Sequence, residues 1–183
     1  MHTLLADLGL LIVKHYYKIC QRDPSVIGFC AISPLPKGEG VGVGEEMLGW
    51  AVGSSHPEAI NRRLREPLPW FAGQMLRLAV TYPSVLVQLA QSVLAPSDAN
   101  ALHPGQIELT YIGVAESAQG QGLGKALLAA FLKASRASNY TSVVLSVETD
   151  NPAALALYTQ AGFQTTKIFR EGRFERQRME LIL

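Results

Sequence analysis

The sequence predicts a single α/β domain built around a mixed β-sheet. Three observations support this fold class. The chain has 183 residues, about the length of one domain. From residue 106 onward, apolar β-branched segments alternate with segments of helical periodicity, in the order strand, helix, strand, helix, strand, strand. Strands that flank a helix pair in parallel and hairpin strands pair antiparallel, so both kinds of pairing are expected in one sheet.

One helix and one hairpin are predicted for the N-terminal part. Apolar residues recur with helical spacing from about residue 3 to 20, and Asp23-Pro24 ends this helix. Residues 26–32 and 47–52 are apolar runs bounded by turn residues, which is typical of two paired strands. The segment 34–44 between them is rich in Pro and Gly. Its glycines repeat every second residue and match no phosphate-binding template, which favours a hairpin tip over a ligand loop.

A largely helical insert is predicted over residues 56–104. Prolines at 57, 67, 69, 83 and 96 divide it, so three short helices are expected. Its uncharged run at 78–97 contains amides, hydroxyls and a proline, which would make a lipid-spanning helix costly. The apolar side chains of this run fall on one helical face instead. The insert is therefore expected to be amphipathic, and no membrane span is predicted.

Six elements are predicted for residues 106–183. They are a strand at 107–114, a helix at 122–137, a strand at 142–147, a helix at 151–161, and a hairpin of strands 164–169 and 174–181 around Glu171-Gly172. The chain shows no internal repeat and no convincing linker, so residues 1–183 are taken as one domain.

The charge balance argues against nucleic acid as a partner. The formal net charge is +1, whereas nucleic-acid-binding proteins usually carry a strongly basic face. Cys20 and Cys30 form no CxxC motif and the four histidines are scattered, which favours a reduced, metal-free protein. A disulfide between the two cysteines is the less favoured alternative. No signal peptide is recognisable, so a cytoplasmic location is expected.

A glycine-rich turn between a strand and a helix is the segment most indicative of chemistry. Gly120, Gly122 and Gly124 lack a Cβ, so backbone N–H groups near the helix N-terminus can approach an anion such as a pyrophosphate. A P-loop would need Gly at 119 and Ser or Thr at 126, where Gln119 and Ala126 stand. A dinucleotide-binding fingerprint also fails, whether it starts at residue 120 or 122.

The remaining pattern, Gln119-x-x-Gly122-x-Gly124 after a strand that ends at Val114, resembles the acetyl-CoA signature of the GNAT superfamily, the GCN5-related N-acetyltransferases. A second segment downstream is also similar to this family. It contains a strand, Asn151 at a helix start, Tyr158 seven residues later, and a Gly-Phe pair at 162–163. The resemblance covers about residues 106–183, the acetyl-CoA-binding half, and extends to the hairpin at 26–52.

The resemblance implies a GNAT-like fold, with a mostly antiparallel central sheet, one splayed parallel pair of strands, and flanking helices. It also implies acetyl-CoA as co-substrate, no metal, and contacts made mostly by the main chain. The pyrophosphate would bind the amides from Gln119 to Lys125, and the pantetheine arm would pair with the strand edge at 112–114. The implied cofactor-binding residues are Ile112, Gly113, Val114, Gln119, Gly120, Gln121, Gly122, Leu123, Gly124, Lys125, Asn151, Ala154 and Tyr158.

Glu108 and Tyr158 are the catalytic candidates. Amine acylation needs a base for the ammonium and an acid for the departing thiolate. Glu108 matches the general-base glutamate of the family, and it should face away from Ile107 and Leu109 if it serves a site rather than an exposed edge. Tyr158 matches the general acid, with a packed structural tyrosine as the alternative. Asn151 has a structural role as well, as N-cap before Pro152.

Other charged residues are ranked lower. Glu116, Glu148 and Asp150 are the next carboxylates to consider, and His56 and His103 are expected to be solvated. Alternating charge in the last hairpin favours a solvated face over a site for an acidic substrate. The four arginines in this hairpin are Arg170, Arg173, Arg176 and Arg178.

The N-terminus departs from the family pattern because no strand precedes the first helix. Either the recorded start lies downstream of the natural one or the strand is absent, and the edge left beside the hairpin makes a homodimer the weak preference. The expected function is transfer of acetyl to a small-molecule or peptide amine. Two alternatives stay open: a CoA-binding module without chemistry, and an interaction protein that docks through residues 70–94.

Overall fold

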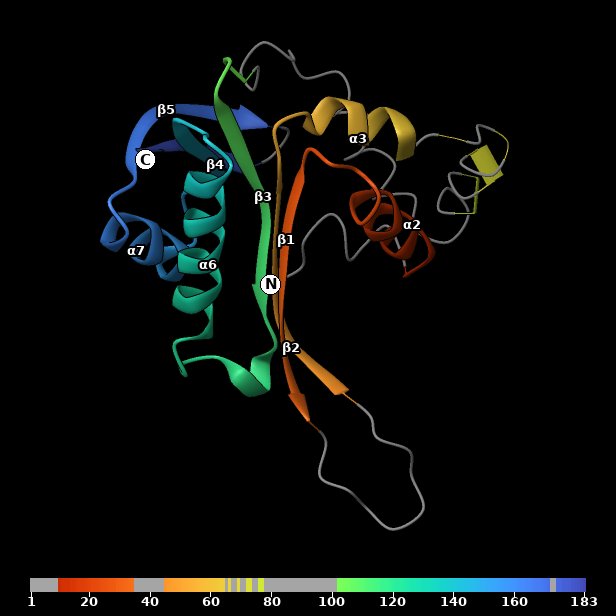
Figure 1. The fold of residues 1–183 in the computed structure, drawn as a ribbon, viewed down its shortest axis with the longest axis horizontal. Coiled ribbons are helices and arrows are strands. Elements are labelled where there is room, and N and C mark those ends of the chain that lie inside the picture. Colours follow the sequence, from red (N-terminus) through yellow and green to blue (C-terminus); the bar gives the residue numbers. More distant parts are fainter. Residues whose placement is uncertain are drawn as a thin grey trace.

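In the computed structural model, a six-stranded mixed sheet has helices on both faces (Figure 1). The structure describes residues 10–34, 45–64, 102–171 and 174–183, together with the isolated positions 66, 69, 72, 73, 76 and 77. The predicted hairpin tip at 34–44, the turn at 172–173 and the insert beyond residue 64 lie largely outside these residues. The strand order is β1-β2-β3-β4-β6-β5.

The described elements agree with the predicted order, with shifts at their ends and one short 3-10 helix, η2, that was not predicted. They are α2 (Leu10–Cys20), β1 (Val26–Pro34), β2 (Glu45–Ser54), α3 (Pro57–Leu64), β3 (Gln106–Val114), the short 3-10 helix η2 (Glu116–Ala118), α6 (Leu123–Ala137), β4 (Ser142–Glu148), α7 (Pro152–Gln160), β5 (Gln164–Glu171) and β6 (Phe174–Ile182). All strand pairs are antiparallel except β3 and β4, which are parallel. The predicted α/β fold with a mixed sheet is confirmed.

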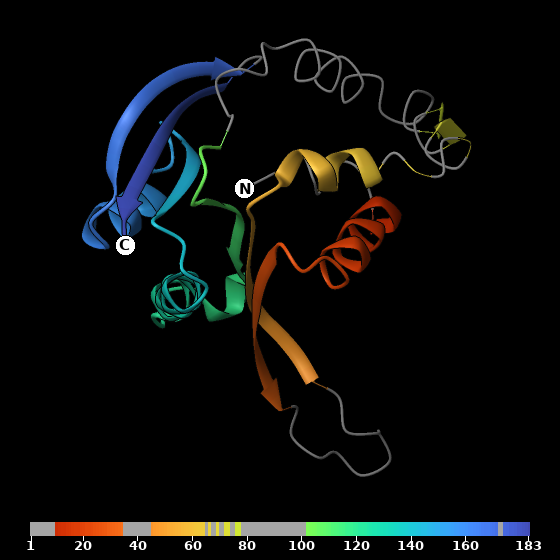
Figure 2. The same cartoon turned by 45° about the horizontal axis from the view of Figure 1, so that its top comes forward.

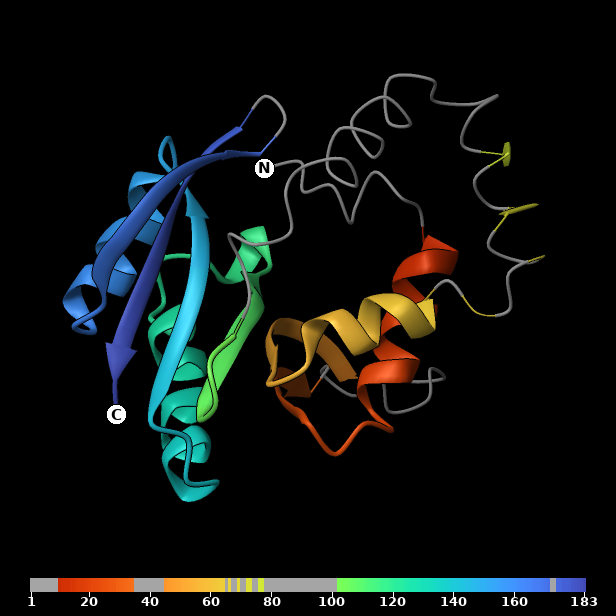
Figure 3. The ribbon, with the colours of Figure 1, turned by 90° about the horizontal axis from the view of Figure 1, so that it is seen from above.

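Helices α6 and α7 cover one face of the sheet, and α2 and α3 lie on the other (Figures 2 and 3). Neighbouring residues of β2 point to opposite faces and pack in different cores. Ala51 of β2 packs in the larger core with Phe131 of α6, whereas Val52 packs in a smaller core with Tyr16 of α2 and Ile60 of α3. The face that bears α6 and α7 is called the helix face below, and the opposite one the α2 face.

A β-bulge in β3 changes which residues point to each face. Leu109 pairs with Gly53 and Tyr111 pairs with Val52, so Thr110 is an extra residue without a partner on β2. Leu109 and Ile112 both pack in the core on the helix face, although three positions separate them. The bulge therefore places Tyr111 on the α2 face, where it packs beside the α2 core.

None of the described helices is long and apolar enough to cross a lipid bilayer. Cys20 and Cys30 are free thiols, the first buried and the second exposed.

Candidate functional site

The parallel strands β3 and β4 separate soon after they pair, and this separation is the central feature of the site. Their pairing covers only Gln106–Glu108 and Ser142–Val144, although β3 continues to Val114 and β4 to Glu148. The other edge of β3 stays bonded to β2, because residues 112–114 pair with residues 49–51. In the described sheet, the β3 edge facing β4 is thus left without a strand partner beyond Glu108. We call this opening the fork.

The turn after β3 is held by contacts to the strand end. The Ala115 amide donates to the carbonyl of Leu48 at 2.8 Å, and the Gln119 side-chain amide donates to the carbonyl of Val114 at 3.2 Å. Gly120 and Gly122 then adopt φ of 75° and 81°, in the left-handed region that disfavours other residues. A Cβ at either position would meet open space, so glycine is required here by the backbone conformation and not by neighbouring atoms.

Helix α6 begins directly behind this turn with no side chain capping it. Gly122 is the N-cap, and the first helical hydrogen bond runs from Ala126 N–H to the Gly122 carbonyl at 3.0 Å. The amides of residues 123–125 therefore have no acceptor within the helix, and the helix dipole adds partial positive charge at this end. Gly124 differs from the other two glycines, since a Cβ there would make only ordinary contacts at 3.8 Å with Leu157 and Val114. This N-terminus, which meets the C-terminal end of the fork, is suited to an anion.

Asn151 caps helix α7 as its sequence position predicts. Its Oδ1 accepts a hydrogen bond from the Ala154 amide at 3.1 Å, and Pro152 occupies the first turn. Ala154 itself is half-buried against the core of the helix face. The structural role of Asn151 is therefore confirmed, and its contact with a cofactor stays a prediction.

Tyr158 lies in the same helix and is almost fully buried. Only 6% of the residue is exposed, and its ring packs edge-on against Phe163 with centroids 5.8 Å apart. Burial raises the pKa of the phenol to about 12, because the charged form would lose hydration. The phenol is therefore protonated at neutral pH and can donate a proton or a hydrogen bond. This arrangement is compatible with both the packing role and the acid role.

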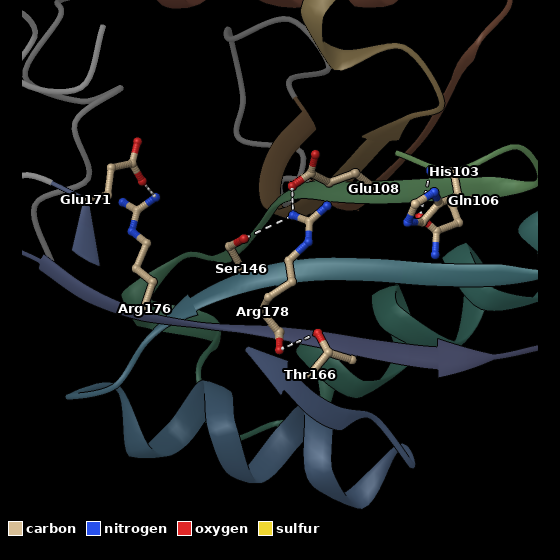
Figure 4. Close-up of polar contacts among 8 residues, drawn as sticks. All are labelled: His103, Gln106, Glu108, Ser146, Thr166, Glu171, Arg176 and Arg178. Carbon is tan, nitrogen blue, oxygen red and sulfur yellow. Dashed lines mark hydrogen bonds and ion pairs between the residues drawn. The ribbon is translucent and has the colours of Figure 1, made fainter. Parts of the chain in front are cut away.

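Glu108 lies at the start of the fork and faces the α2 side. Its neighbours Ile107 and Leu109 are in the core on the helix face, as predicted. Its Oε1 accepts a hydrogen bond from Nη1 of Arg178 at 2.5 Å, and the same Nη1 donates to Oγ of Ser146 at 3.0 Å (Figure 4). Burial raises the pKa of the Glu108 carboxyl, and the Arg178 guanidinium opposes this by favouring the charged form.

Arg178 is the residue that the sequence interpretation placed wrongly. Alternating charges in the last hairpin suggested a solvated face, but Arg178 is 7% exposed and contacts Glu108. The reason is that β6 is an internal strand between β4 and β5, so the Arg178 side chain lies beside Ser146 of β4 and reaches Glu108 of β3 across it. Arg176, on the same face, bonds Glu171 at 2.6 Å and lies 3.6 Å from Glu148. The spacing of Arg176 and Arg178 shows that they share one face of a strand. Only the strand order shows which residues this face contacts.

An aromatic cluster on the α2 face was also missed. Tyr16 packs edge-on against Tyr17 and Tyr111, with ring centroids 5.5 Å apart in both pairs, and Tyr17 packs on Trp50 at 6.5 Å. The four residues come from α2, β2 and β3, so no local pattern joins them. We call these four residues the aromatic wall, and they lie on the same side of the sheet as Glu108.

The other candidate residues do not gather around Glu108. Glu116 and Asp150 are exposed, and His103 is exposed in the segment before β3. His56 donates its backbone amide to Ser54 at the start of α3. Among the described residues, no three His, Cys, Asp or Glu side chains group into a metal site. The metal-free character of the protein stays a prediction.

Comparison with known proteins agrees with this geometry. The acetyltransferase (GNAT) family matches residues 86–163. The mycothiol acetyltransferase of Jonesia denitrificans is 37% identical over 117 residues, which are 60% of this chain and 35% of that protein. The ribosomal-protein-S18-alanine N-acetyltransferase of Escherichia coli superimposes with a TM-score of 0.53 at 18% identity, over 92% of this chain and 75% of that one. An acetyltransferase of Bacillus subtilis in complex with CoA gives a TM-score of 0.50 at 16% identity, over 94% and 82%.

Residues 86–163 therefore match the acetyltransferase (GNAT) family, and the GNAT-like fold expected for the chain is confirmed. The chain spans about a third of the length of the Jonesia denitrificans relative that it matches.

Proposed function

We propose that this protein is an acyl-CoA-dependent N-acyltransferase that transfers acetyl from acetyl-CoA to a primary amine by direct attack in a ternary complex. The observation that carries the proposal is the continuity of the fork. One open strand edge leads from the buried Glu108 carboxylate to the uncapped N-terminus of α6. An extended ligand with an anionic end and a reactive end fits such a site.

The residues around the turn fit acetyl-CoA. The amides from Gln119 to Lys125 would hold the pyrophosphate, because Gly120 and Gly122 keep open space where a Cβ would lie and the first-turn amides of α6 lack acceptors. The free edge of β3 at 112–114 would pair with the amide groups of the pantetheine arm. When bound, acetyl-CoA supplies the activated thioester, and members of the GNAT family use it as acetyl donor.

Glu108 would serve as the base. Its Oε1 is engaged by Arg178, whereas in the described part of the chain Oε2 takes no hydrogen bond and can accept a proton, directly or through a water. The ammonium of the acceptor loses this proton first, and the lone pair of the neutral nitrogen then attacks the acetyl carbon. A new C–N bond forms and the C–S bond breaks.

Tyr158 would serve as the acid. Its phenol stays protonated well above neutral pH and would donate its proton to the departing thiolate. A main-chain N–H near Val114 would stabilise the oxyanion of the tetrahedral intermediate. An acyl-enzyme intermediate on cysteine is not expected. Cys20 is buried in the smaller core on the α2 face, and Cys30 lies on β1, so neither is in a segment that suggests this role.

The acceptor is expected to be a small-molecule or peptide amine. The relatives support an amine acceptor, since their names include a mycothiol acetyltransferase and a protein-alanine N-acetyltransferase. In this chain, the aromatic wall around Tyr111 and the carboxylates Glu108 and Glu171 border the same side of the sheet, where an ammonium group is stabilised by both. Nucleic acid is not expected, because the chain carries a net charge of only +1.

A CoA-binding module without chemistry is the second candidate. The observation that favours it is the ion pair of Glu108, because a carboxylate engaged by Arg178 is also what a purely structural pair would show. Both candidates predict that the protein binds CoA, but only the acyltransferase predicts turnover.

Replacing the base separates the two candidates. We expect Glu108→Gln to bind acetyl-CoA as tightly as the wild type and to lose about 10²–10⁴-fold in kcat, because the amine would have to lose its proton without a base. Binding is measured by calorimetry, and turnover by thiol release with a panel of primary amines that includes peptides with a free N-terminus. Glu116→Gln, at an exposed carboxylate, is the matched control. Full activity of Glu108→Gln would exclude this residue as base, and CoA binding by the wild type without turnover would favour the second candidate.

The expected assembly and location also remain proposals. Strand β1 is at the edge of the described sheet, and Phe29 and Ile32 on it are 37% and 51% exposed, which supports a homodimer through this edge. A mass near 19.8 kDa in solution would contradict the dimer. The absence of a CxxC motif supports the cytoplasm, which fractionation of cells would test.

A further inference from the structure

Arg178 connects the two sides of the fork. Its side chain starts on β6, crosses β4 and reaches Glu108 on β3, as Figure 4 shows. On the way its Nη1 bonds Ser146 of β4, the strand between β3 and β6. Ser146 lies two residues beyond Val144, where the pairing of β3 and β4 ends. The guanidinium therefore links three strands at the point where the fork opens.

Strand pairing fixes the positions of both partners in this contact. Glu108 belongs to the last backbone pair of the two parallel strands, and Arg178 lies opposite Ser146 in the β4–β6 register. The side chains of Arg178 and Glu108 are only 9% and 14% exposed. A fixed cation beside a buried carboxylate stabilises its ionised form. The hydrogen bond between the two groups also fixes the orientation of the carboxylate.

We propose that Arg178 is the positioning residue for the base: it keeps the Glu108 carboxylate ionised and directed into the fork, with Ser146 holding the guanidinium in place. This inference rests on the proposed function. Arg178 itself touches neither reactant in this role. It acts through Glu108, whose other carboxylate oxygen remains available to the amine.

Few other charged groups influence Glu108 in the described structure. From β6 it meets Arg178, and Glu171 of β5 acts in the opposite direction, since a second carboxylate raises the pKa of Glu108. Tyr111 lies on the same strand and has a raised pKa itself, caused first by burial. The Arg178 guanidinium is thus the group that favours the ionised carboxylate, against burial and Glu171. Its removal should raise the pKa of Glu108 further.

The experiment compares Arg178→Met, which removes the charge, with Arg178→Lys, which keeps it. Arg176→Met is the matched control, because Arg176 lies on the same strand and face but bonds Glu171. The ionisation of Glu108 is followed by carbon-13 NMR of its carboxyl carbon over pH, with Glu108→Gln for assignment. This readout needs no turnover. The pH dependence of kcat/KM with an amine acceptor is the second readout.

For Arg178→Met we expect the NMR midpoint of Glu108 to move to higher pH. Removal of one opposite charge at this distance shifts a carboxyl equilibrium about tenfold or more, so the midpoint should move by about one pH unit or more. The ratio of kcat/KM at pH 6 to that at pH 9 should fall relative to the wild type, because a smaller fraction of Glu108 is ionised at pH 6. Arg178→Lys and Arg176→Met should keep the wild-type midpoint. A midpoint that is unchanged in a folded Arg178→Met protein would overturn the proposal.

Two milder variants test the positioning role if Arg178→Met does not fold. Ser146→Ala and Arg178→Lys both loosen the geometry and leave a cation beside Glu108, so we expect a severalfold lower kcat with an unchanged NMR midpoint. Wild-type kcat in both variants would overturn the positioning role. A wild-type protein without turnover on any amine would instead overturn the proposed function, and a moved midpoint with an unchanged pH–rate profile would overturn the link between the pair and the reaction.

Discussion

Single residues in this protein acquire their properties from burial as much as from their type. Glu108, Arg178 and Tyr158 are ordinary surface residue types, yet all three are buried or nearly so. Burying such groups costs free energy. An ion pair offsets this cost for Glu108 and Arg178, and Tyr158 avoids it because its phenol is neutral. The chemistry proposed here depends on these environments.

Tyr158 leads to a prediction about alkaline stability. Its pKa rises from 10.0 to about 12 on folding, so the folded state keeps the phenol neutral while the unfolded state ionises it. The stabilising contribution is present below pH 10 and is lost as the pH rises towards 12. In Tyr158→Phe this loss is absent, so the free energy of unfolding should fall less steeply between pH 10 and 12 than in the wild type, by about 2–3 kcal/mol over the whole range.

Urea unfolding at pH 9, 10 and 11 measures this difference. Tyr140→Phe is a suitable control, because that ring is only partly buried at the edge of the core. Parallel stability curves for the wild type and Tyr158→Phe would contradict the raised pKa. The same variant would report on the acid role through its kcat at neutral pH.

At the scale of elements, the bulge in β3 decides which residues share the α2 face. In a regular strand without the bulge, strict alternation along residues 109–111 would place Tyr111 on the same face as Leu109, the helix face. The bulge lies opposite Gly53 of β2, where the backbone of β3 and the ring of Phe131 in α6 come close. Backbone and helix approach so closely here because residue 53 has no side chain.

Gly53→Ala should therefore destabilise the protein. A Cβ at this position would overlap the Glu108 carbonyl oxygen and lie 2.7 Å from Cε2 of Phe131. We expect a cost of about 1–3 kcal/mol, as for other overpacked cores, which corresponds to a fall in Tm of roughly 2–12 °C for a chain of this size. Thermal unfolding followed by circular dichroism measures it.

Gly28→Ala is the matched control on the neighbouring strand. Its Cβ would make ordinary contacts, 3.7 Å from Val52 and 3.9 Å from the Ala51 carbonyl oxygen. Its Tm should stay the same or rise slightly, because alanine lowers the entropy of the unfolded chain. Equal Tm values for the two variants would show that β2 and α6 adjust to the added methyl group.

At the scale of the whole molecule, the fork divides the sheet into two halves. Strands β1, β2 and β3 form one half and β4, β6 and β5 the other. The links between them include three residue pairs of β3 and β4, the Glu108–Arg178 pair, the Gln106–Glu180 hydrogen bond and the shared core on the helix face. A ligand in the fork would bridge these halves. Binding to the folded state alone should then raise the stability of the whole domain.

Acetyl-CoA is accordingly expected to raise the Tm. At about 100 times its Kd the gain is about 2.7 kcal/mol, or roughly 5–10 °C for a domain of this length. Gly122→Val should reduce this ligand-induced shift, because a β-branched residue disfavours the φ of 81° found there. Gly124→Ala, which meets only ordinary contacts, should keep most of it. Equal shifts in both variants would argue against the α6 N-terminus as the pyrophosphate site.

The order of the elements, the mixed sheet, the glycine turn before α6 and the Asn151 cap could all be predicted from the sequence. These features depend on local periodicity and on backbone conformations that few residues adopt, so neighbouring residues suffice to predict them. The orientation of Glu108 was also predictable, because alternation along one strand is local.

Which distant residues meet at the fork depends on the tertiary structure. Arg178 is separated from Glu108 by 70 residues, and its burial follows from the internal position of β6 in the strand order. The aromatic wall of Tyr16, Trp50 and Tyr111 depends likewise on α2 packing across two strands and on the register shift at Thr110. Strand order and register arise from packing of the whole chain, and a charge pattern within one hairpin therefore looked like a solvated surface.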